Sequence, residues 1–300
     1  MEVMTVSAPL TGWASFRAYL EMIKFEHSIF ALPFAMVGMM WGSVAARDSL
    51  WPGWEKFGLI VLAMVSCRSA AMAFNRIVDR QIDAKNARTA IRAIPAGILG
   101  LRQVHLFFAG SVGLFLVAAA LLNPLALALS PVALLVTLGY SYTKRFTPLC
   151  HLILGLSLAI APAAAFIGVT GTLDPRILSL VFAVMGWTAG FDILYSLQDE
   201  EFDRREGLYS MPVWLGRVKA LWASRLLHAL TVGLLIWTGF LWSLGPLYFA
   251  GVAVAAGLLL YEQSLVKPDD LSRINLAFFT LNGWVSLGFF VFALLDGVLS

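Results

Sequence analysis

The sequence predicts an all-α protein, a polytopic membrane bundle of nine transmembrane helices. Of its 300 residues, 60% are hydrophobic and only 13% are charged, whereas a soluble domain has about 25% charged residues. Apolar runs recur along the chain and approach the ~20 residues that a helix needs to cross a bilayer. Because lipid offers the backbone no hydrogen-bond partners, such runs are expected to be helical. No long hydrophilic stretch separates them, so we expect one integral-membrane domain over residues 1–300.

Turn-forming clusters divide the apolar runs into nine expected spans. These cover approximately residues 20–46, 57–78, 103–122, 125–143, 149–170, 177–197, 219–241, 246–264 and 274–296. Most breaks coincide with Gly, Pro, Asn or Asp, which favour turns. Only Asn123 and Pro124 separate the third span from the fourth, so these two could form a tight hairpin or one kinked helix.

Lysine and arginine are distributed unevenly between the two ends of the spans. With a cytoplasmic N-terminus, the basic loops 80–102, 144–148, 200–219 and 265–273 are cytoplasmic, and the opposite side holds only Arg47, Lys56 and Arg176. By the positive-inside rule, this bias predicts a bacterial-type inner-membrane protein whose polar clusters face the cytoplasm. The net charge of +3 therefore reflects topology. Nucleic acid is excluded as a partner, because no soluble basic domain is present.

Two acidic clusters end two of the spans on this cytoplasmic side. The cluster after the second span holds Asn75, Asp79 and Asp83, and the cluster after the sixth holds Asp192, Tyr195, Asp199 and Asp203. Spacings of three and four residues place each set on one helical face. Arg68, seven residues before Asn75, shares the face of the first cluster.

Carboxylates stacked on one face repel one another, so such a face needs cations to compensate. Mg²⁺ prefers oxygen ligands and is commonly held by one or two carboxylates together with substrate phosphates. Two such helices that face each other could hold Mg²⁺ ions bridging a diphosphate. The alternative is a solvated face at the membrane surface that only carries charge. Two clusters with matching spacing at the same membrane surface favour the metal site.

Basic and aromatic residues near the clusters suit an anionic substrate. Arg88 and Arg92 lie in the loop after the first cluster, and arginine matches phosphate oxygens bidentately; alternatively they are positive-inside anchors. Tyr140 and Lys144, followed by Arg145, end the fourth span. Their spacing suits an aromatic wall for a carbocation beside a cationic partner for a leaving diphosphate, whereas the alternative is an interfacial tyrosine and an anchoring lysine.

Two further pairs of polar residues are candidates for substrate contacts. Lys24 and His27 lie near the start of the first span, where a charge could hold a substrate carboxylate or simply snorkel to the interface. Asn275 and Asn282 lie seven residues apart in the ninth span and are expected to share a face. They could line a cavity or join helices by hydrogen bonds.

Together, these motifs resemble those of the UbiA superfamily of intramembrane prenyltransferases. The first cluster resembles the family's first aspartate-rich motif, the second resembles its second motif, and Tyr140-x3-Lys144 matches a further one. The loop with Arg88 and Arg92 is similar to the family loop after the first motif, although Ala93 stands where the family more often has proline. The resemblance covers essentially the whole chain. The segments 24–27 and 268–275 look like those of the 4-hydroxybenzoate polyprenyltransferase branch and its menaquinone-pathway relatives.

The resemblance implies nine helices around a central cavity that opens sideways to membrane lipid and is capped by cytoplasmic loops. The implied substrates are a polyprenyl diphosphate and an aromatic acid, either 4-hydroxybenzoate or a dihydroxynaphthoate, and the implied cofactor is Mg²⁺. The expected metal ligands are Asp79, Asp83, Asp199 and Asp203. The residues expected to take part in catalysis are Asp192, Asp199, Tyr140 and Lys144. The residues expected to bind substrate are Arg68, Asn75, Arg88, Arg92, Lys144, Arg145, Tyr195, Lys24 and Asn275.

The predicted chemistry follows from charge. Metal-bound diphosphate becomes a leaving group, and the basic residues take up its charge. The electron-rich ring of the acceptor then attacks the allylic cation. Asp192 orients or deprotonates the acceptor. A transporter of an anionic solute is the rival hypothesis, but transporter sites lie near the bilayer midplane, whereas these carboxylates lie at one end. A non-catalytic scaffold would not need two matched acidic clusters.

Overall fold

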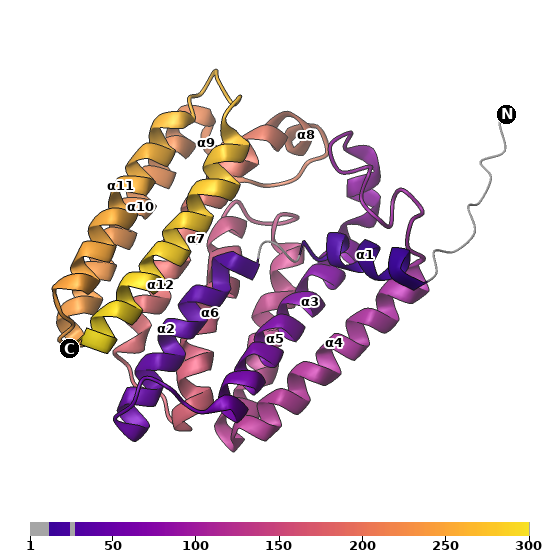
Figure 1. Cartoon of the computed structure of the whole chain (residues 1–300). Coiled ribbons are helices and arrows are strands. Elements are labelled where there is room, and N and C mark those ends of the chain that lie inside the picture. The colour runs from indigo at the N-terminus through magenta and orange to yellow at the C-terminus, as the bar shows by residue number, and fades with distance from the viewer. Residues whose placement is uncertain (1–11, 25–27, 300) are drawn as a thin grey trace, which may run out of the picture.

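The computed structural model describes residues 12–24 and 28–299, and every regular element in these ranges is helical. Within them, nine helices are long and apolar enough to cross a membrane, which confirms the predicted fold class (Figure 1). The long helices are α2 (Ser28–Arg47), α3 (Trp54–Lys85), α4 (Leu101–Leu122), α5 (Pro124–Thr143), α6 (Cys150–Thr170), α7 (Ile177–Ser196), α10 (Arg217–Leu241), α11 (Pro246–Leu265) and α12 (Asn282–Leu299). The short elements are α1 (Gly12–Met22), the 3-10 turn η2 (Leu197–Asp199), α8 (Glu200–Arg205), α9 (Met211–Leu215) and the π-helical segment η3 (Leu276–Leu281).

The long helices stand side by side in one bundle (Figure 1). Large apolar side chains such as Leu106, Leu121, Leu135 and Leu226 are exposed on its outer surface, as expected of a face that contacts lipid. The loops 86–100, 144–149, 206–216 and 266–275 all lie at the same end of the bundle, and the connections α2–α3, α4–α5, α6–α7 and α10–α11 lie at the other (Figure 1). The predicted loops therefore gather at one end.

The prediction of one continuous first span over 20–46 is wrong at its start. α1 ends at Met22 and α2 begins at Ser28, so the apolar run is divided between two helices. Ala18 and Met22 of α1 pack beside α3 and α4 in a buried cluster with Ala73 and Val104. The opposite face of α1 is exposed and carries the Arg17–Glu21 ion pair, which suits a surface helix and not a spanning one.

The third and fourth spans are two separate helices joined by Asn123. The Asn123 side chain accepts a hydrogen bond from the Ala126 backbone N–H at 2.8 Å and so caps the start of α5. Its amide also donates to the backbone oxygen of Ile167 in α6 at 2.8 Å. Lys56 of α3 donates to the carbonyls of Leu122 at 3.1 Å and Gly168 at 3.0 Å. These bonds satisfy helix ends at the far side of the bundle, and they favour the hairpin over a kinked helix.

The two acidic clusters differ in backbone structure. α3 continues without interruption to Lys85, so Asn75, Asp79 and Asp83 share one helical face as predicted. The second cluster is not on a continuous helix, because η2 separates α7 from α8 and Asp199 ends that 3-10 turn. A 3-10 turn has fewer residues per turn than an α-helix, but Asp192, Tyr195, Asp199 and Asp203 still line the same cavity. The second cluster therefore keeps the shared side that its spacing predicts, although its helix is interrupted.

Candidate active site

A cavity of about 1170 Å³ opens between α2, α3, α5, α6 and α7. Both acidic clusters line one end of it, and apolar residues such as Ile60, Leu122 and Ala161 line the other. Since α3 rises about 1.5 Å per residue, the wall from Asp79 to Ile60 is about 28 Å long. The cavity thus runs along most of the bundle, with a charged mouth and an apolar body.

The carboxylates of the first cluster are buried at the mouth and paired with basic side chains. Asp79 accepts hydrogen bonds from Asn75 at 2.8 Å and from Arg145 at 2.8 Å. Asp83 forms an ion pair with Arg92 at 2.7 Å through Oδ1. Its second oxygen, Oδ2, is buried and has no hydrogen-bond partner. A buried carboxylate oxygen without a partner is costly, so this atom is ready to accept a cation or a donor from a ligand.

The second cluster is tied to the loop that follows α3. Arg88 pairs with both oxygens of Asp199, and its Nε donates to Oδ1 at 3.1 Å. Asn86 donates to the same oxygen at 3.1 Å, and the Arg88 guanidinium also lies over the Tyr195 ring, 5.4 Å from its centroid. Burial opposes the charge of Arg88, but the Asp199 carboxylate outweighs it and raises the arginine pKa above its usual value. Loop 86–100 is therefore held over the mouth by charge.

The remaining residues expected at the mouth also line the cavity. These are Tyr140, Lys144, Asp192 and Asp203. Asp203 is buried in α8, and the positive charge of Lys144 is among the charges that act on it. The backbone oxygen of Lys144 accepts a hydrogen bond from the Tyr209 N–H at 2.7 Å, which fixes the end of α5 against the loop before α9. The structure thus brings α3, α5, α7 and α8 together around one volume.

The carboxylate oxygens at the mouth suit a hard cation, provided that a bound ligand supplies further coordinating atoms. The four expected ligands supply only carboxylate oxygens, the kind that Mg²⁺ prefers. Asp83 lines the cavity, and one of its carboxylate oxygens is buried without a partner. Among the described residues, no three His, Cys, Asp or Glu side chains are grouped closely enough to hold an ion alone. The residues therefore fit a hard cation such as Mg²⁺ if a bound ligand supplies further oxygen atoms.

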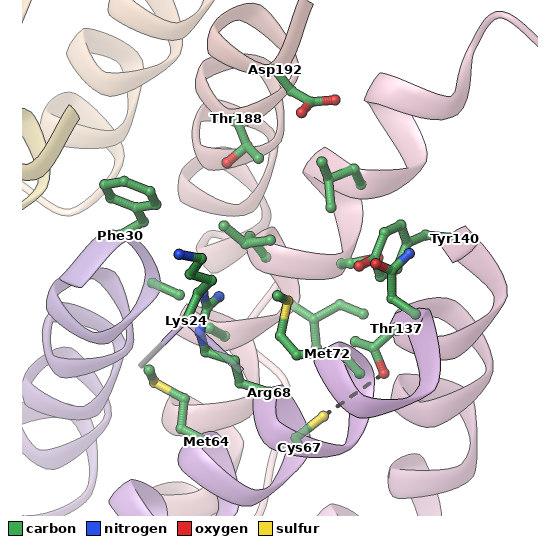
Figure 2. A pocket seen from close by; sticks show the side chains of 18 of the residues that line it. Lys24, Phe30, Met64, Cys67, Arg68, Met72, Thr137, Tyr140, Thr188 and Asp192 are labelled. Atoms are coloured by element: carbon green, nitrogen blue, oxygen red, sulfur yellow. Dashed lines mark hydrogen bonds between the residues drawn. The ribbon is translucent and has the colours of Figure 1, made fainter. Parts of the chain in front are cut away.

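Arg68 is a second unusual charge, deeper in the cavity. It projects from α3 into the cavity in Figure 2. At about 1.5 Å per residue, it lies about 16 Å along the helix from Asp79. Its Nε atom is buried without a hydrogen-bond partner, and no carboxylate of the described residues forms an ion pair with it. Lys24, just before the undescribed residues 25–27, lines the same cavity, whereas the predicted residue His27 lies outside the described part of the chain.

The two asparagines of the ninth span do not share a face, contrary to the prediction. Asn275 lines the cavity. Asn282 is fully buried and joins helices, accepting a hydrogen bond from Trp187 at 2.6 Å and donating to Glu262 at 3.0 Å. The π-helical segment η3 lies between them, and its wider turn rotates one asparagine relative to the other.

Sequence reasoning missed His151, which lies against one of the predicted catalytic residues. Its Nδ1 atom is 2.6 Å from Oδ2 of Asp192. The two residues are 41 positions apart and belong to different helices, so no local spacing could reveal the pair. The aromatic residues Phe30 and Phe278, which also line the cavity, were missed for the same reason.

Comparisons with known proteins identify the family of this chain. The model of the UbiA prenyltransferase family matches residues 31–285. The 4-hydroxybenzoate octaprenyltransferase of Saccharophagus degradans is 29% identical over 287 residues, which cover 96% of this chain and 95% of the relative. The enzyme of the same description from Vibrio cholerae is 31% identical over 270 residues, covering 89% of this chain and 93% of the relative.

Solved structures share the helical arrangement. The apo structure of a UbiA homolog from Aeropyrum pernix has a TM-score of 0.82 at 34% identity, covering 90% of this chain and 98% of that one. The UbiA homolog from Archaeoglobus fulgidus, bound to DMAPP and Mg²⁺, has a TM-score of 0.74 at 20% identity, covering 94% and 99%. At that identity, the second likeness concerns the fold alone.

Proposed function

The chain belongs to the UbiA prenyltransferase family, and from that premise we propose that it transfers a polyprenyl group from its diphosphate to the ring of an aromatic acid. The acid is 4-hydroxybenzoate or a dihydroxynaphthoate, as in quinone biosynthesis, and the reaction uses Mg²⁺. One observation carries the proposal: a single cavity has a mouth of carboxylates and arginines and a long apolar body. Such a cavity complements a molecule with a diphosphate at one end and a hydrocarbon chain at the other.

In this proposal the mouth binds the donor. Asp79, Asp83, Asp199 and Asp203 would hold Mg²⁺, which when bound would supply positive charge that makes diphosphate a better leaving group. The arginines at the mouth are already paired with three of these carboxylates. These arginine forks lie where they would also meet the phosphate oxygens of the donor, which they match bidentately.

The same proposal assigns the residues below the mouth to the reacting groups. Tyr140 presents its ring to the allylic cation, and Lys144 meets the departing diphosphate. Arg68 and Lys24 hold the carboxylate of the acceptor, because the unpaired Arg68 guanidinium needs an anion. Asp192 accepts the proton that the acceptor loses. The apolar body excludes the water that would otherwise quench the cation.

We further propose that the mouth faces the cytoplasm in a bacterial-type inner membrane and that residues 1–300 act as one domain. The lysine and arginine bias supports this orientation. Single cysteines at Ala90 and Leu173, which lie in loops at opposite ends of the bundle, would test it. A membrane-impermeant thiol reagent should label them from opposite sides, and labelling of both from one side would contradict the topology.

The reaction itself is tested with purified protein in lipid nanodiscs. A prenyl diphosphate and 4-hydroxybenzoate are supplied with Mg²⁺, and diphosphate release and prenylated product are both measured. We expect product only when donor, acid and Mg²⁺ are all present. Diphosphate release without any prenylated aromatic product, across a panel of hydroxybenzoates and dihydroxynaphthoates, would overturn the proposed acceptor class.

A further inference from the structure

His151 connects the candidate catalytic carboxylate Asp192 to the loop region at the mouth. The imidazole lies at the start of α6 and is only 3% exposed. Its Nδ1 atom is 2.6 Å from Oδ2 of Asp192 on α7. On the other side of the ring, Nε2 accepts a hydrogen bond from the Met211 backbone N–H at 3.2 Å. Both ring nitrogens are therefore engaged.

The Met211 contact determines which nitrogen carries the proton. A backbone N–H can only donate, so Nε2 must present its lone pair and cannot be protonated. Met211 begins α9, and the first N–H groups of a helix have no partner within the helix, so this donor is free for the imidazole. The ring proton is thereby assigned to Nδ1, which donates it to Asp192. His151 in this arrangement is a neutral donor of fixed tautomer.

We propose that His151 is a positioning residue that holds Asp192 as an oriented carboxylate, with one oxygen fixed and the other directed to the acceptor. This inference rests on the proposed function. Figure 2 shows Asp192 and Thr188 projecting from α7 into the cavity, across from Tyr140 and Met72. Because Oδ2 is engaged by His151, Oδ1 is the carboxylate oxygen left for the acceptor.

The proton balance of the step is fixed by the same contacts. The bond between the prenyl carbon and diphosphate oxygen breaks, and its electron pair leaves with diphosphate. The ring forms a bond to the prenyl carbon with its own π electrons and then loses its proton to Asp192, which restores aromaticity. His151 does not take this proton, because the Nε2 lone pair is bound to Met211. It donates to the carboxylate throughout, and such a donor favours the charged form.

Three variants separate positioning from simple support of the fold. His151→Leu removes the donor, His151→Asn keeps an N–H donor in place of Nδ1, and Asp192→Asn removes the carboxylate itself. His105→Leu is the control, because His105 is exposed on α4 and its Nδ1 atom lies 2.8 Å from the Leu101 carbonyl oxygen of the same helix. Each variant is compared in nanodiscs for kcat, for the KM of both substrates and for its thermal unfolding midpoint.

We expect His151→Leu to lower kcat about tenfold to a hundredfold, the range typical of lost support for a reacting group. The donor KM should change less than threefold, because His151 does not line the cavity in which the donor would bind. His151→Asn should recover most of the lost rate. The double variant His151→Leu/Asp192→Asn should be no slower than Asp192→Asn alone, because the histidine acts only through the carboxylate.

Four results would overturn this inference while leaving the proposed function intact. They are wild-type kcat in His151→Leu, an equal rise in donor KM, no recovery in His151→Asn, or multiplied losses in the double variant. The inference would also be rejected if kcat fell in proportion to the thermal unfolding midpoint in every histidine variant, including His105→Leu. Absence of prenylated product from the wild-type protein would instead reject the proposed function.

Discussion

The unpaired guanidinium of Arg68 gives the sharpest test of where the acceptor binds. Arg68→Met keeps a long side chain but removes the charge. A hydrogen bond to a charged group contributes about 1.5–3 kcal/mol, and about 1.4 kcal/mol corresponds to a factor of ten. The acceptor KM should therefore rise about tenfold to a hundredfold. Stability should not fall, because no carboxylate of the described residues loses a partner and a buried unpaired group is removed.

The assay varies 4-hydroxybenzoate against its carboxamide at saturating prenyl diphosphate. Wild-type protein should prefer the acid, and Arg68→Met should lose that preference because only the acid carries the charge. Arg80→Met is the matched control on the same helix, since Arg80 bonds the Ile77 carbonyl at 2.8 Å and does not line the cavity. An unchanged preference for the acid in Arg68→Met, or an equal loss in Arg80→Met, would refute the assignment.

Three further outcomes are expected. EDTA should abolish turnover, Mg²⁺ should restore it, and Asp83→Ala should lower the rate about a hundredfold or more; activity that persists in chelator would exclude the metal role. Lys144→Met should raise the donor KM and lower kcat with little change in acceptor KM, as steady-state kinetics would show, and wild-type kinetics would identify an anchor. Gly38→Ala should lower the free energy of unfolding by about 1–3 kcal/mol, because its Cβ would lie 2.0 Å from the Pro162 oxygen, whereas Gly58→Ala, with nothing within 4 Å, should not. Equal unfolding midpoints in detergent would contradict that contact.

The features predicted correctly from sequence are those set by local periodicity and by the membrane. The cluster on α3 kept its face because the helix is continuous from Trp54 to Lys85, and a period of 3.6 residues then decides which side chains align. The span boundaries follow from apolar length, which lipid enforces. The first span was wrong at its start because hydropathy does not distinguish the surface helix α1 from the spanning helix α2 that follows it.

The features that escaped prediction depend on helices meeting in space or on local changes of helix type. The His151–Asp192 contact and the Arg88–Asp199 ion pair join distant parts of the chain. Helical periodicity relates only residues of the same helix, so it could not predict either pair. The prediction that Asn275 and Asn282 share a face failed because η3 is π-helical. No residue pattern in this segment indicates that change of helix type.

Two unsatisfied charged atoms at the cavity wall favour a ligand that carries complementary charge. Asp296, buried in α12, accepts hydrogen bonds from the backbone N–H groups of Gly245 at 2.8 Å and Tyr248 at 3.2 Å, so it stabilises the start of α11. Arg68 Nε and Asp83 Oδ2 have no such partners, and leaving them buried costs stability. Since both residues line one cavity, a ligand that brings an anion to the first and a metal ion to the second would recover that cost on binding. The free energy recovered when these buried charges gain partners would then contribute to binding and orienting the two substrates.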